Sequence, residues 1–326
     1  MSDRFERAAR LVHALGEAGG ALPAARLTTF GDAPDLESAL ATLGDLVSLE
    51  TDGTLRFGPR GSALAAADVQ ASLGGATWGR ELEVLATIGS TNDRAAERAA
   101  AGAAPGLVVT AELQTAGRGR RGRVFDSRPG LGIWSTTLLP VPADPAAAPR
   151  LSLIAALAVA EAVEERTGFS PALKWPNDVR IGGRKICGVL VEARSAGGRV
   201  FPVAGIGINV HHRPQDFPPE VAPFATSVEE ATRRHVGRSE LLATLIARLE
   251  RKVAAEVAGR LDLADEFARR DEWLGRSVSI EVGGGERVEG TARGVDATGA
   301  LRLDVPGRGE VRVISGEASL VLSEES

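Results

Sequence analysis

The chain has 326 residues, more than one ordinary domain holds, and 44 % of them are hydrophobic, which is enough to build a substantial core. A single cysteine, Cys187, excludes an internal disulfide framework, and neither a signal peptide nor an apolar run long enough to span a membrane is present, so we expect a cytoplasmic protein of two or three domains without a membrane partner. The net charge of −5 neither predicts nor excludes nucleic acid as a partner.

Residues 1–60 have the pattern of a winged helix-turn-helix module. Three stretches with helical apolar spacing precede a hairpin whose turn is Asp52-Gly53. The helices are expected over residues 5–18, 22–27 and 35–43, and the hairpin strands over 46–50 and 54–58. The linker that follows, residues 61–80, is expected to contain one helix, over 62–73.

Residues 81–271 alternate strands with helices. Strands are expected over residues 82–88, 107–113, 132–139, 185–193 and 200–210. Helices are expected over residues 90–101, 151–167 and 239–270, with surface loops at 140–149 and 212–226. A side-chain oxygen of the triplet Ser90-Thr91-Asn92 is expected to cap the first of these helices. Residues 272–326 contain five short stretches with strand character, split by glycine-rich turns, and predict a small β-barrel.

Residues 117–123, Gly-Arg-Gly-Arg-Arg-Gly-Arg, put four arginines and three glycines into seven positions. Arginine donates paired hydrogen bonds to phosphate and carboxylate, and glycine lets the backbone approach a ligand. Because four crowded cations repel one another until an anion arrives, we expect a loop that is mobile when empty and orders around a polyanion such as a triphosphate. We call residues 117–123 the arginine loop.

The glycines of the arginine loop also match the fingerprint of dinucleotide-binding proteins, G-x-G-x-x-G. That fingerprint opens a helix, whereas a turn is expected here over residues 124–130. The pattern therefore argues against a nicotinamide-dependent enzyme.

A second polar cluster, Lys174-Trp175-Pro176-Asn177-Asp178, combines groups that can hold a ligand carboxylate, a phosphate or a metal ion. The chain has only three lysines among its 38 basic residues, and two of them, Lys174 and Lys185, lie eleven positions apart. A lysine in a chain that otherwise uses arginine points to a need for a compact point charge. Downstream, Gly205 and Gly207 interrupt an apolar strand and allow a flat ligand to approach closely.

These motifs together resemble biotin protein ligases over nearly the whole chain. The residues that carry the resemblance are, in order, 90–92, 114–123, 174–178, 185–192 and 205–209. The resemblance implies an α+β protein with a winged-helix-like module, a central mixed sheet with flanking helices as in biotin and lipoate ligases, and an SH3-like C-terminal barrel. It also implies a catalytic domain over residues 81–271 and a barrel over 272–326.

The activity that this resemblance implies has two steps. Biotin and ATP form biotinyl-5'-AMP, with Mg²⁺ as cofactor, and biotin then passes to a lysine in the biotin carboxyl carrier domain of a carboxylase. A homodimer is compatible with the resemblance, and the sequence does not choose between monomer and dimer.

The resemblance also assigns roles to single residues. Lys174 and Arg118 would be catalytic, because two anions meet in the first step and cations must neutralise them. Trp134 would cover biotin, and Phe125 would offer its ring to adenine, although the surrounding Val-Phe-Asp departs from the usual sequence of the family. Residues expected to bind biotin are Ser90, Thr91, Asn92, Gln114, Arg118, Gly119, Arg120, Trp134, Lys174, Gly188 and Gly207. Residues expected to bind ATP are Arg120, Arg121, Arg123, Phe125, Asn177, Asp178, Lys185 and Asn209. The ligands of the metal ion and a general base are not identified.

Three residues are set aside. His211 and His212 are adjacent and cannot face one metal ion as an i, i+4 helical pair does, and with His13 and His235 distant in sequence we expect both to be surface residues. No Cys/His set has the spacing of a zinc site. Cys187 lies in an apolar strand and is expected to be a small buried hydrophobe.

The N-terminal module is poorly equipped for DNA. Residues 1–75 carry six arginines, no lysine and ten acidic residues, a net charge of −4, and the expected recognition helix over 35–43 has no cation. A recognition helix in the major groove needs donors for phosphates and bases. We therefore expect weak or absent DNA binding, which disfavours a biotin-responsive repressor as the main function. A lipoate or octanoate ligase on the same core is a further alternative, although the Arg-Arg-x-Ser-Gly-Gly-Gly loop of those relatives is absent.

Overall fold

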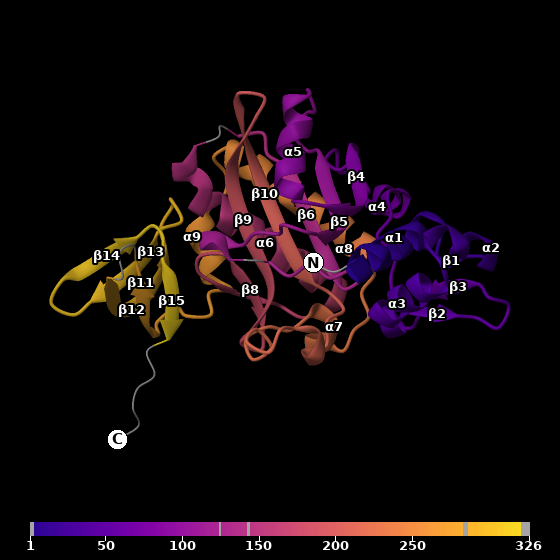
Figure 1. The fold of residues 1–326 in the computed structure, drawn as a ribbon. Helices are drawn as coiled ribbons and strands as arrows, with labels where there is room; N and C mark the ends of the chain where they lie inside the picture. The colour runs from indigo at the N-terminus through magenta and orange to yellow at the C-terminus, as the bar shows by residue number, and fades with distance from the viewer. Residues whose placement is uncertain (1–2, 124, 142–143, 283–285, 321–326) are drawn as a thin grey trace, which may run out of the picture.

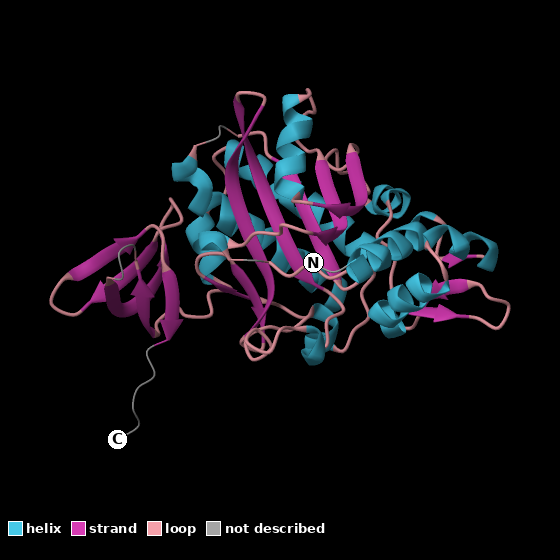
Figure 2. Ribbon diagram, viewed as in Figure 1, coloured by secondary structure: helices cyan, strands magenta, loops and turns pink. Residues whose placement is uncertain are grey.

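Three sheets follow one another along the chain. The computed structural model describes residues 3–123, 125–141, 144–282 and 286–320. The N-terminal sheet has three strands, the central sheet seven and the C-terminal sheet five. Figure 1 shows the central sheet between the N-terminal sheet at the right and the C-terminal sheet at the left. Helices accompany the N-terminal and central sheets, which confirms the α+β class (Figure 2). None of the helices in these described ranges has the length and apolarity needed to cross a membrane.

The N-terminal module contains three helices and a small sheet. The helices are α1 (Asp3–Glu17), α2 (Ala24–Leu27) and α3 (Ala33–Leu43), and the strands are β1 (Ala21–Leu22), β2 (Val47–Leu49) and β3 (Leu55–Phe57), in the order β1-β3-β2. The hairpin forms where the sequence predicts it, because Gly53 takes a φ of +80° and the carboxylate of Asp52 accepts a hydrogen bond from the Thr54 amide at 2.8 Å. The apolar core of the module includes Leu131, which ties it to the central region.

The central sheet is mixed, as expected. Its strands are β4 (Leu82–Ile88), β5 (Val108–Gln114), β6 (Gly132–Leu138), β7 (Ala172–Lys174), β8 (Asp178–Ile181), β9 (Arg184–Ala196) and β10 (Arg199–Asn209), in the order β4-β5-β6-β10-β9-β8-β7. The β4–β5 pair is parallel, and the other neighbours are antiparallel.

Helices cover both faces of this sheet. Successive side chains of a strand point to opposite faces, so Val108 packs with helix α6 (Ala148–Thr167) and helix α8 (Arg238–Val257), whereas Val109 packs with helix α5 (Thr91–Ala100). The remaining helices are α4 (Ala66–Ser72), α7 (Val228–Thr232) and α9 (Leu263–Ala268). Short 3-10 turns are η1 (Thr28–Phe30), η2 (Gly44–Leu46), η3 (Arg120–Gly122), η4 (Pro145–Ala147) and η5 (Pro214–Asp216).

The prediction of one long helix over residues 239–270 is wrong, because this stretch forms two helices, α8 and α9. Gly259 takes a φ of +65°, which ends the first helix, and the Asp262 carboxylate begins the second by accepting from the Asp265 amide at 3.1 Å. The β7–β8 hairpin was not predicted, because its strands are too short to show alternation. It is this hairpin that presents Lys174 and Asp178.

The C-terminal sheet has the five strands that the sequence predicts. They are β11 (Ser277–Glu281), β12 (Arg287–Val295), β13 (Leu301–Val305), β14 (Gly309–Val313) and β15 (Glu317–Leu320), in the order β14-β13-β12-β11-β15. The Trp175 indole N–H donates to the Gly299 carbonyl at 3.1 Å, so this sheet is joined to the β7–β8 turn.

Candidate active site

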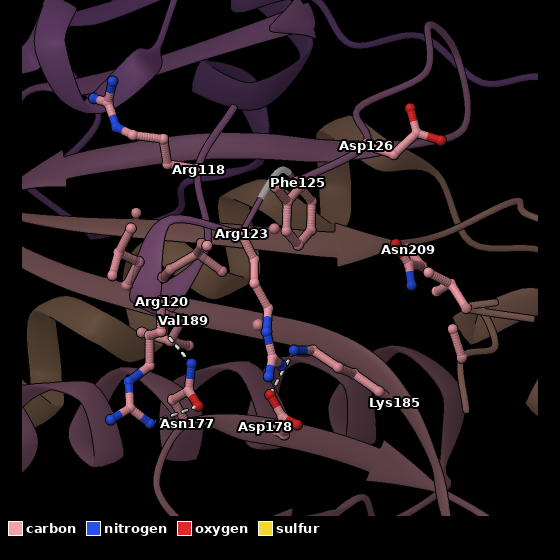
Figure 3. A pocket seen from close by; sticks show the side chains of 18 of the residues that line it. Arg118, Arg120, Arg123, Phe125, Asp126, Asn177, Asp178, Lys185, Val189 and Asn209 are labelled. Atoms are coloured by element: carbon pink, nitrogen blue, oxygen red, sulfur yellow. Dashed lines mark hydrogen bonds and ion pairs between the residues drawn. The ribbon is translucent and has the colours of Figure 1, made fainter. Parts of the chain in front are cut away.

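A cavity of about 720 Å³ opens between the arginine loop and strands β9 and β10 (Figure 3). Nearly all residues predicted from the sequence line it: Ser90, Thr91, Asn92, Gln114, Arg118, Gly119, Arg120, Arg123, Phe125, Lys174, Asn177, Asp178, Lys185, Gly188, Gly207 and Asn209. The side chain of Arg121 lies outside the described part of the structure. Trp134 is buried beneath Phe125, at 5.4 Å between ring centroids, and is not among the described residues that line the cavity.

One end of the cavity is formed by the start of α5. Ser90 occupies the cap position, but its side chain does not cap the helix as predicted. Instead Gln114 of β5 reaches across, and its Oε1 accepts from the backbone N–H of Thr91 at 2.9 Å and from the Thr91 hydroxyl at 3.0 Å. Asn92 donates to Glu192 at 2.8 Å and accepts from the Thr136 hydroxyl at 2.6 Å. This end is therefore a buried set of hydroxyl and amide groups fixed by hydrogen bonds between helix α5 and strands of the sheet, the kind of wall that orients a polar ring system.

Arg118 is anchored to the same helix. Its guanidinium donates to the carboxylate of Asp93 at 2.8 Å and to the Ser90 hydroxyl at 3.3 Å. Arg194 of β9 also donates to Asp93. Burial opposes ionisation of Asp93, but these two arginines outweigh it and hold its pKa below the usual range. The loop that the sequence predicts to be mobile is thus tied at its first arginine to Asp93 of α5, the carboxylate that Arg194 of β9 also contacts.

Lys174 is a partly desolvated cation. Its Nζ lies 4.8 Å from the centre of the Trp273 ring, in the segment between α9 and β11. Burial lowers the pKa of Lys174, an effect opposed by the nearby Asp178 carboxylate. The aromatic face stabilises the charged form, and none of the described residues gives Lys174 a hydrogen-bonded anion, so the charge is available to an anionic ligand.

A group of charged and amide side chains converges in the lower part of the view in Figure 3. Lys185 Nζ lies 2.6 Å from Asp178 Oδ1, and Arg123 points toward this pair. Asn177 donates to the Val189 carbonyl at 2.7 Å and accepts from Arg120 at 3.5 Å. Cations from two separate segments therefore meet here, as binding of a polyphosphate requires.

Two histidine assignments from the sequence are wrong. His211 and His212 are not surface residues, since they are only 1 % and 3 % exposed. His212 stacks on Phe217 at 4.8 Å between ring centroids and lines the cavity, and burial lowers its pKa to about 3. His211 is not among the described residues that line the cavity, and its Nδ1 lies 2.6 Å from Glu229 Oε2. Cys187 is buried as expected, and burial raises the pKa of its thiol.

Sequence reasoning missed several residues of this site. Trp273 beneath Lys174, and Gly316 and Ala318 at the rim of the cavity, all belong to the C-terminal part of the chain. No motif marked them, because their position depends on how the C-terminal sheet packs against the β7–β8 turn. Asp93 had a signal, since it directly follows the Ser90-Thr91-Asn92 triplet.

Comparison with known proteins places two regions of the chain in known families. Residues 84–209 match the biotin/lipoate A/B protein ligase family, and residues 273–321 match the biotin protein ligase C-terminal domain. The chain is 38 % identical to the biotin–acetyl-CoA-carboxylase ligase of Mycobacterium tuberculosis, over 72 % of this chain and 86 % of that protein. It is 32 % identical to the bifunctional ligase/repressor BirA of Bacillus subtilis, over 74 % of each chain.

A solved structure shares the fold. Biotin protein ligase from Aquifex aeolicus in complex with biotin and ATP superposes with a TM-score of 0.64 at 29 % identity, covering 75 % of this chain and 100 % of that one. Fold and site therefore define a ligase enzyme. The chain belongs to the biotin protein ligase family.

Proposed function

We propose that this protein is an ATP-dependent biotin protein ligase, which forms biotinyl-5'-AMP and transfers biotin to a lysine in the biotin carboxyl carrier domain of a carboxylase. The observation that carries the proposal is a single cavity in which a wall of hydroxyl and amide groups adjoins two groups of cations, the arginine loop and the pair Lys174 and Lys185. A neutral polar ring and a triphosphate need these two environments side by side.

In the first step a biotin carboxylate oxygen attacks the α-phosphorus of ATP, and pyrophosphate leaves. Lys174 neutralises the approaching carboxylate and the non-bridging oxygens of the phosphate, and the arginines of the loop hold the other phosphates. In the second step the amine of the acceptor lysine attacks the carbonyl carbon of the mixed anhydride, and AMP leaves. Arg118 keeps the loop closed in between, because water would hydrolyse the anhydride.

Mg²⁺ fits this site through Asp178. Magnesium is usually held in nucleotide sites by one or two carboxylates together with substrate phosphates, and Asp178 lines the cavity beside Lys185 and Asn177. The ion would neutralise the charge of the phosphates together with Lys185 and Arg123.

The deciding assay is ATP–pyrophosphate exchange with the purified full chain, offering biotin, lipoate and octanoate separately. Exchange with biotin alone supports the proposal. Exchange with lipoate or octanoate would mean that the substrate is that of the related ligases on the same core. Absence of exchange with all three acids would contradict the proposed first step. Transfer is then measured with a biotin carboxyl carrier domain and with its acceptor lysine replaced by arginine.

A repressor role is the second candidate, because relatives such as the B. subtilis protein are named bifunctional ligase/repressor. The composition of α3 weighs against it, since the helix has an acidic first turn and no basic residue in its last turn. We infer that the N-terminal module binds DNA weakly or not at all. A specific gel shift with the upstream region of a biotin operon, in the presence of biotin and ATP at physiological salt, would overturn this inference.

A further inference from the structure

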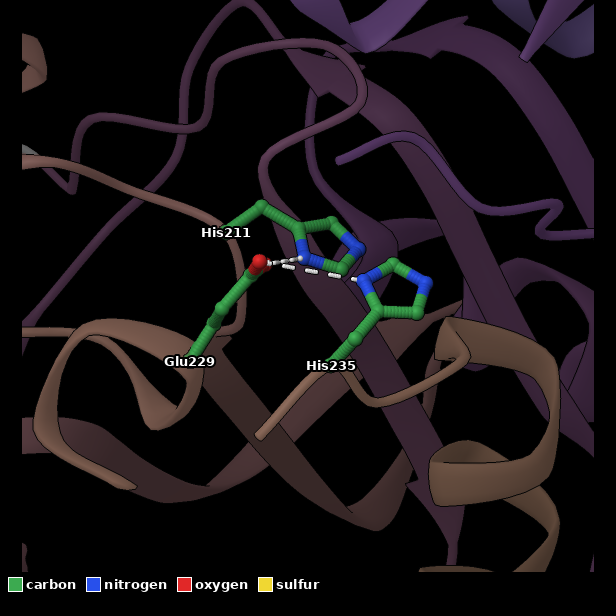
Figure 4. A group of neighbouring side chains, drawn as sticks. All are labelled: His211, Glu229 and His235. Carbon is green, nitrogen blue, oxygen red and sulfur yellow. Dashed lines mark hydrogen bonds and ion pairs between the residues drawn. The ribbon is translucent and has the colours of Figure 1, made fainter. Parts of the chain in front are cut away.

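A cluster of two histidines and a glutamate lies apart from the catalytic cavity (Figure 4). His211 follows β10, Glu229 lies in the first turn of α7, and His235 lies between α7 and α8. One ligand-capable atom from each of the three side chains lies within 4.8 Å of the other two. Their roles are not explained by the ligase reaction, because none of the three lines the cavity among the described residues.

The side chains converge on one point. His211 Nδ1 lies 2.6 Å from Glu229 Oε2, and His235 Nδ1 lies 3.8 Å from Glu229 Oε1. The two imidazole rings stack at 5.3 Å between centroids with 10° between their planes, so both Nδ1 atoms face the same carboxylate. If Glu229 served only to hydrogen-bond His211, the imidazole of His235 would not need to face the same carboxylate.

The far side of His211 has the partner that a metal-binding histidine requires. Its Nε2 lies 2.8 Å from the Ser62 hydroxyl, and Ser62 is itself fixed by the backbone N–H of Arg238 at 3.2 Å. A hydrogen bond on one ring nitrogen is the usual device that orients the other nitrogen toward a metal ion. In the 2.6 Å contact the Nδ1–H of His211 donates to the Glu229 carboxylate, and Nε2 accepts from the Ser62 hydroxyl. On metal binding the proton would move to Nε2 and be donated to Ser62, which leaves the Nδ1 lone pair directed at the site shared with Glu229 and His235.

We propose that His211, Glu229 and His235 form a binding site for a divalent transition-metal ion of the zinc class, with water as a fourth ligand. Two imidazoles and a carboxylate are a donor set of zinc, which takes ligands at about 2.0–2.2 Å in a tetrahedral arrangement. His235 is 46 % exposed, which leaves one side of the cluster open to solvent for the water.

Small movements suffice to load the site. Metal–ligand bonds of about 2.1 Å in a tetrahedron separate the ligand atoms by about 3.4 Å. The His211–Glu229 pair must therefore open from 2.6 Å, and His235 must close in from 3.8 Å. His211 is buried and stays in place, whereas the exposed side chain of His235 and the glutamate can rotate.

The bound ion would tie together segments that are far apart in the sequence. Ser62 of the linker contacts the His211 ring, and Arg60, the last residue of the N-terminal module, donates to the His211 carbonyl oxygen. The ion would fix this residue to α7 and to the segment that leads into α8. We therefore assign the site a structural role, which strengthens the contact between the linker and the ligase region and does not depend on the proposed reaction.

The test uses the full chain, freed of metal with a chelator and titrated with Co²⁺ as a spectroscopic probe, then with Zn²⁺. We expect one Co²⁺ per chain with visible d–d absorption, displacement by Zn²⁺, and a melting temperature that rises with metal concentration. His235→Ala and Glu229→Gln should each weaken Co²⁺ binding at least about tenfold, since each removes one of three protein ligands. Neither residue lines the catalytic cavity.

His13→Ala is the matched control, because His13 lies in α1 outside the cluster and its loss should leave Co²⁺ binding unchanged. Absence of saturable Co²⁺ absorption would overturn the proposal. Equal affinity of the parent and His235→Ala would overturn it as well, because the ion would then be held elsewhere. All of these readouts are independent of ligase activity.

Discussion

The ring of Phe125 lies directly against the backbone of Gly207, in strand β10. A Cβ atom at Gly207 would collide with the ring, and a Cβ at Gly188, the cross-strand partner of Gly207, would touch it at 3.7 Å. Two glycines side by side therefore form a flat shelf on the sheet, and the aromatic residue that follows the arginine loop rests on it. This shelf explains why an apolar strand is interrupted by glycine at this position.

Gly207→Ala should displace Phe125 from the shelf and weaken ATP binding. Overpacking costs about 1–3 kcal/mol, so we expect the KM for ATP to rise roughly tenfold, which corresponds to about 1.4 kcal/mol. Gly75→Ala is the control, because nothing lies within 4 Å of a Cβ there. Initial rates at varied ATP measure the effect, and an unchanged KM in Gly207→Ala would show that Phe125 does not contact the nucleotide.

Lys174→Met should leave the fold intact and abolish most of the first step. Methionine keeps an unbranched apolar stem against Trp273, whereas the charge that meets the carboxylate and the α-phosphate is lost. Removing one such electrostatic contact lowers ATP–pyrophosphate exchange by at least about a hundredfold. Thermal unfolding provides the check on folding. Exchange close to that of the parent, with an unchanged melting temperature, would remove Lys174 from the catalytic group.

The lowered pKa of Lys174 predicts an early loss of activity at alkaline pH. Only the charged amine neutralises an anion, and burial favours the neutral form of Lys174. We therefore expect kcat/KM to begin to fall at a pH below the usual lysine pKa of about 10.4. The alkaline limb of the kcat/KM profile, which reports the free enzyme, measures this effect. A value of kcat/KM that stays constant up to about pH 10 would contradict this expectation.

The sequence predicted what is contiguous in the chain and missed what depends on packing. The arginine loop and the cluster 174–178 could be found because each places several ligand-binding side chains within a few positions. The contact of Lys174 with Trp273 joins a strand of the central sheet to the segment between α9 and β11, and no local pattern encodes it. His211 was predicted to be a surface residue for the same reason. Its hydrogen-bond partners Ser62 and Glu229 lie 149 and 18 positions away in the sequence, and they satisfy the ring nitrogens of the buried imidazole.

A buried ion pair joins β5 to the start of α8. Glu112 and Arg238 are both fully buried, with 2.6 Å between Arg238 Nη1 and Glu112 Oε2, and Glu112 also accepts from the Gly130 amide at 3.0 Å. Glu112→Gln would leave the guanidinium charge without its counter-ion, and we expect the free energy of unfolding to fall by about 3–5 kcal/mol.

The control for this change is an exposed pair of the same type. Glu165→Gln removes one of the two glutamate partners of Arg248 on the surface, where the Glu165 side chain is 46 % exposed, and should cost less than about 1 kcal/mol. Urea denaturation of both variants supplies the comparison. Equal losses of stability would mean that solvent reaches the Glu112–Arg238 pair.

Asp271 should make the protein less stable as the pH rises. Its Oδ1 accepts from the Trp273 amide at 2.9 Å, but its buried Oδ2 has no hydrogen-bond partner among the described residues. Burial raises the pKa of Asp271 to about 6, above the value of about 3.9 expected in the unfolded chain. The folded state therefore binds this proton more tightly, and the stabilisation present at low pH is lost as the pH rises through about 6.

Asp271→Asn keeps the acceptor for Trp273 and removes the titration. We expect the variant and the parent to have similar stability near pH 4, and the variant to become the more stable of the two above pH 7, because only the parent then carries a buried unpaired charge. Urea denaturation at several pH values measures the difference. If the gap between the two proteins does not grow across this range, the carboxylate is solvated and its pKa is ordinary.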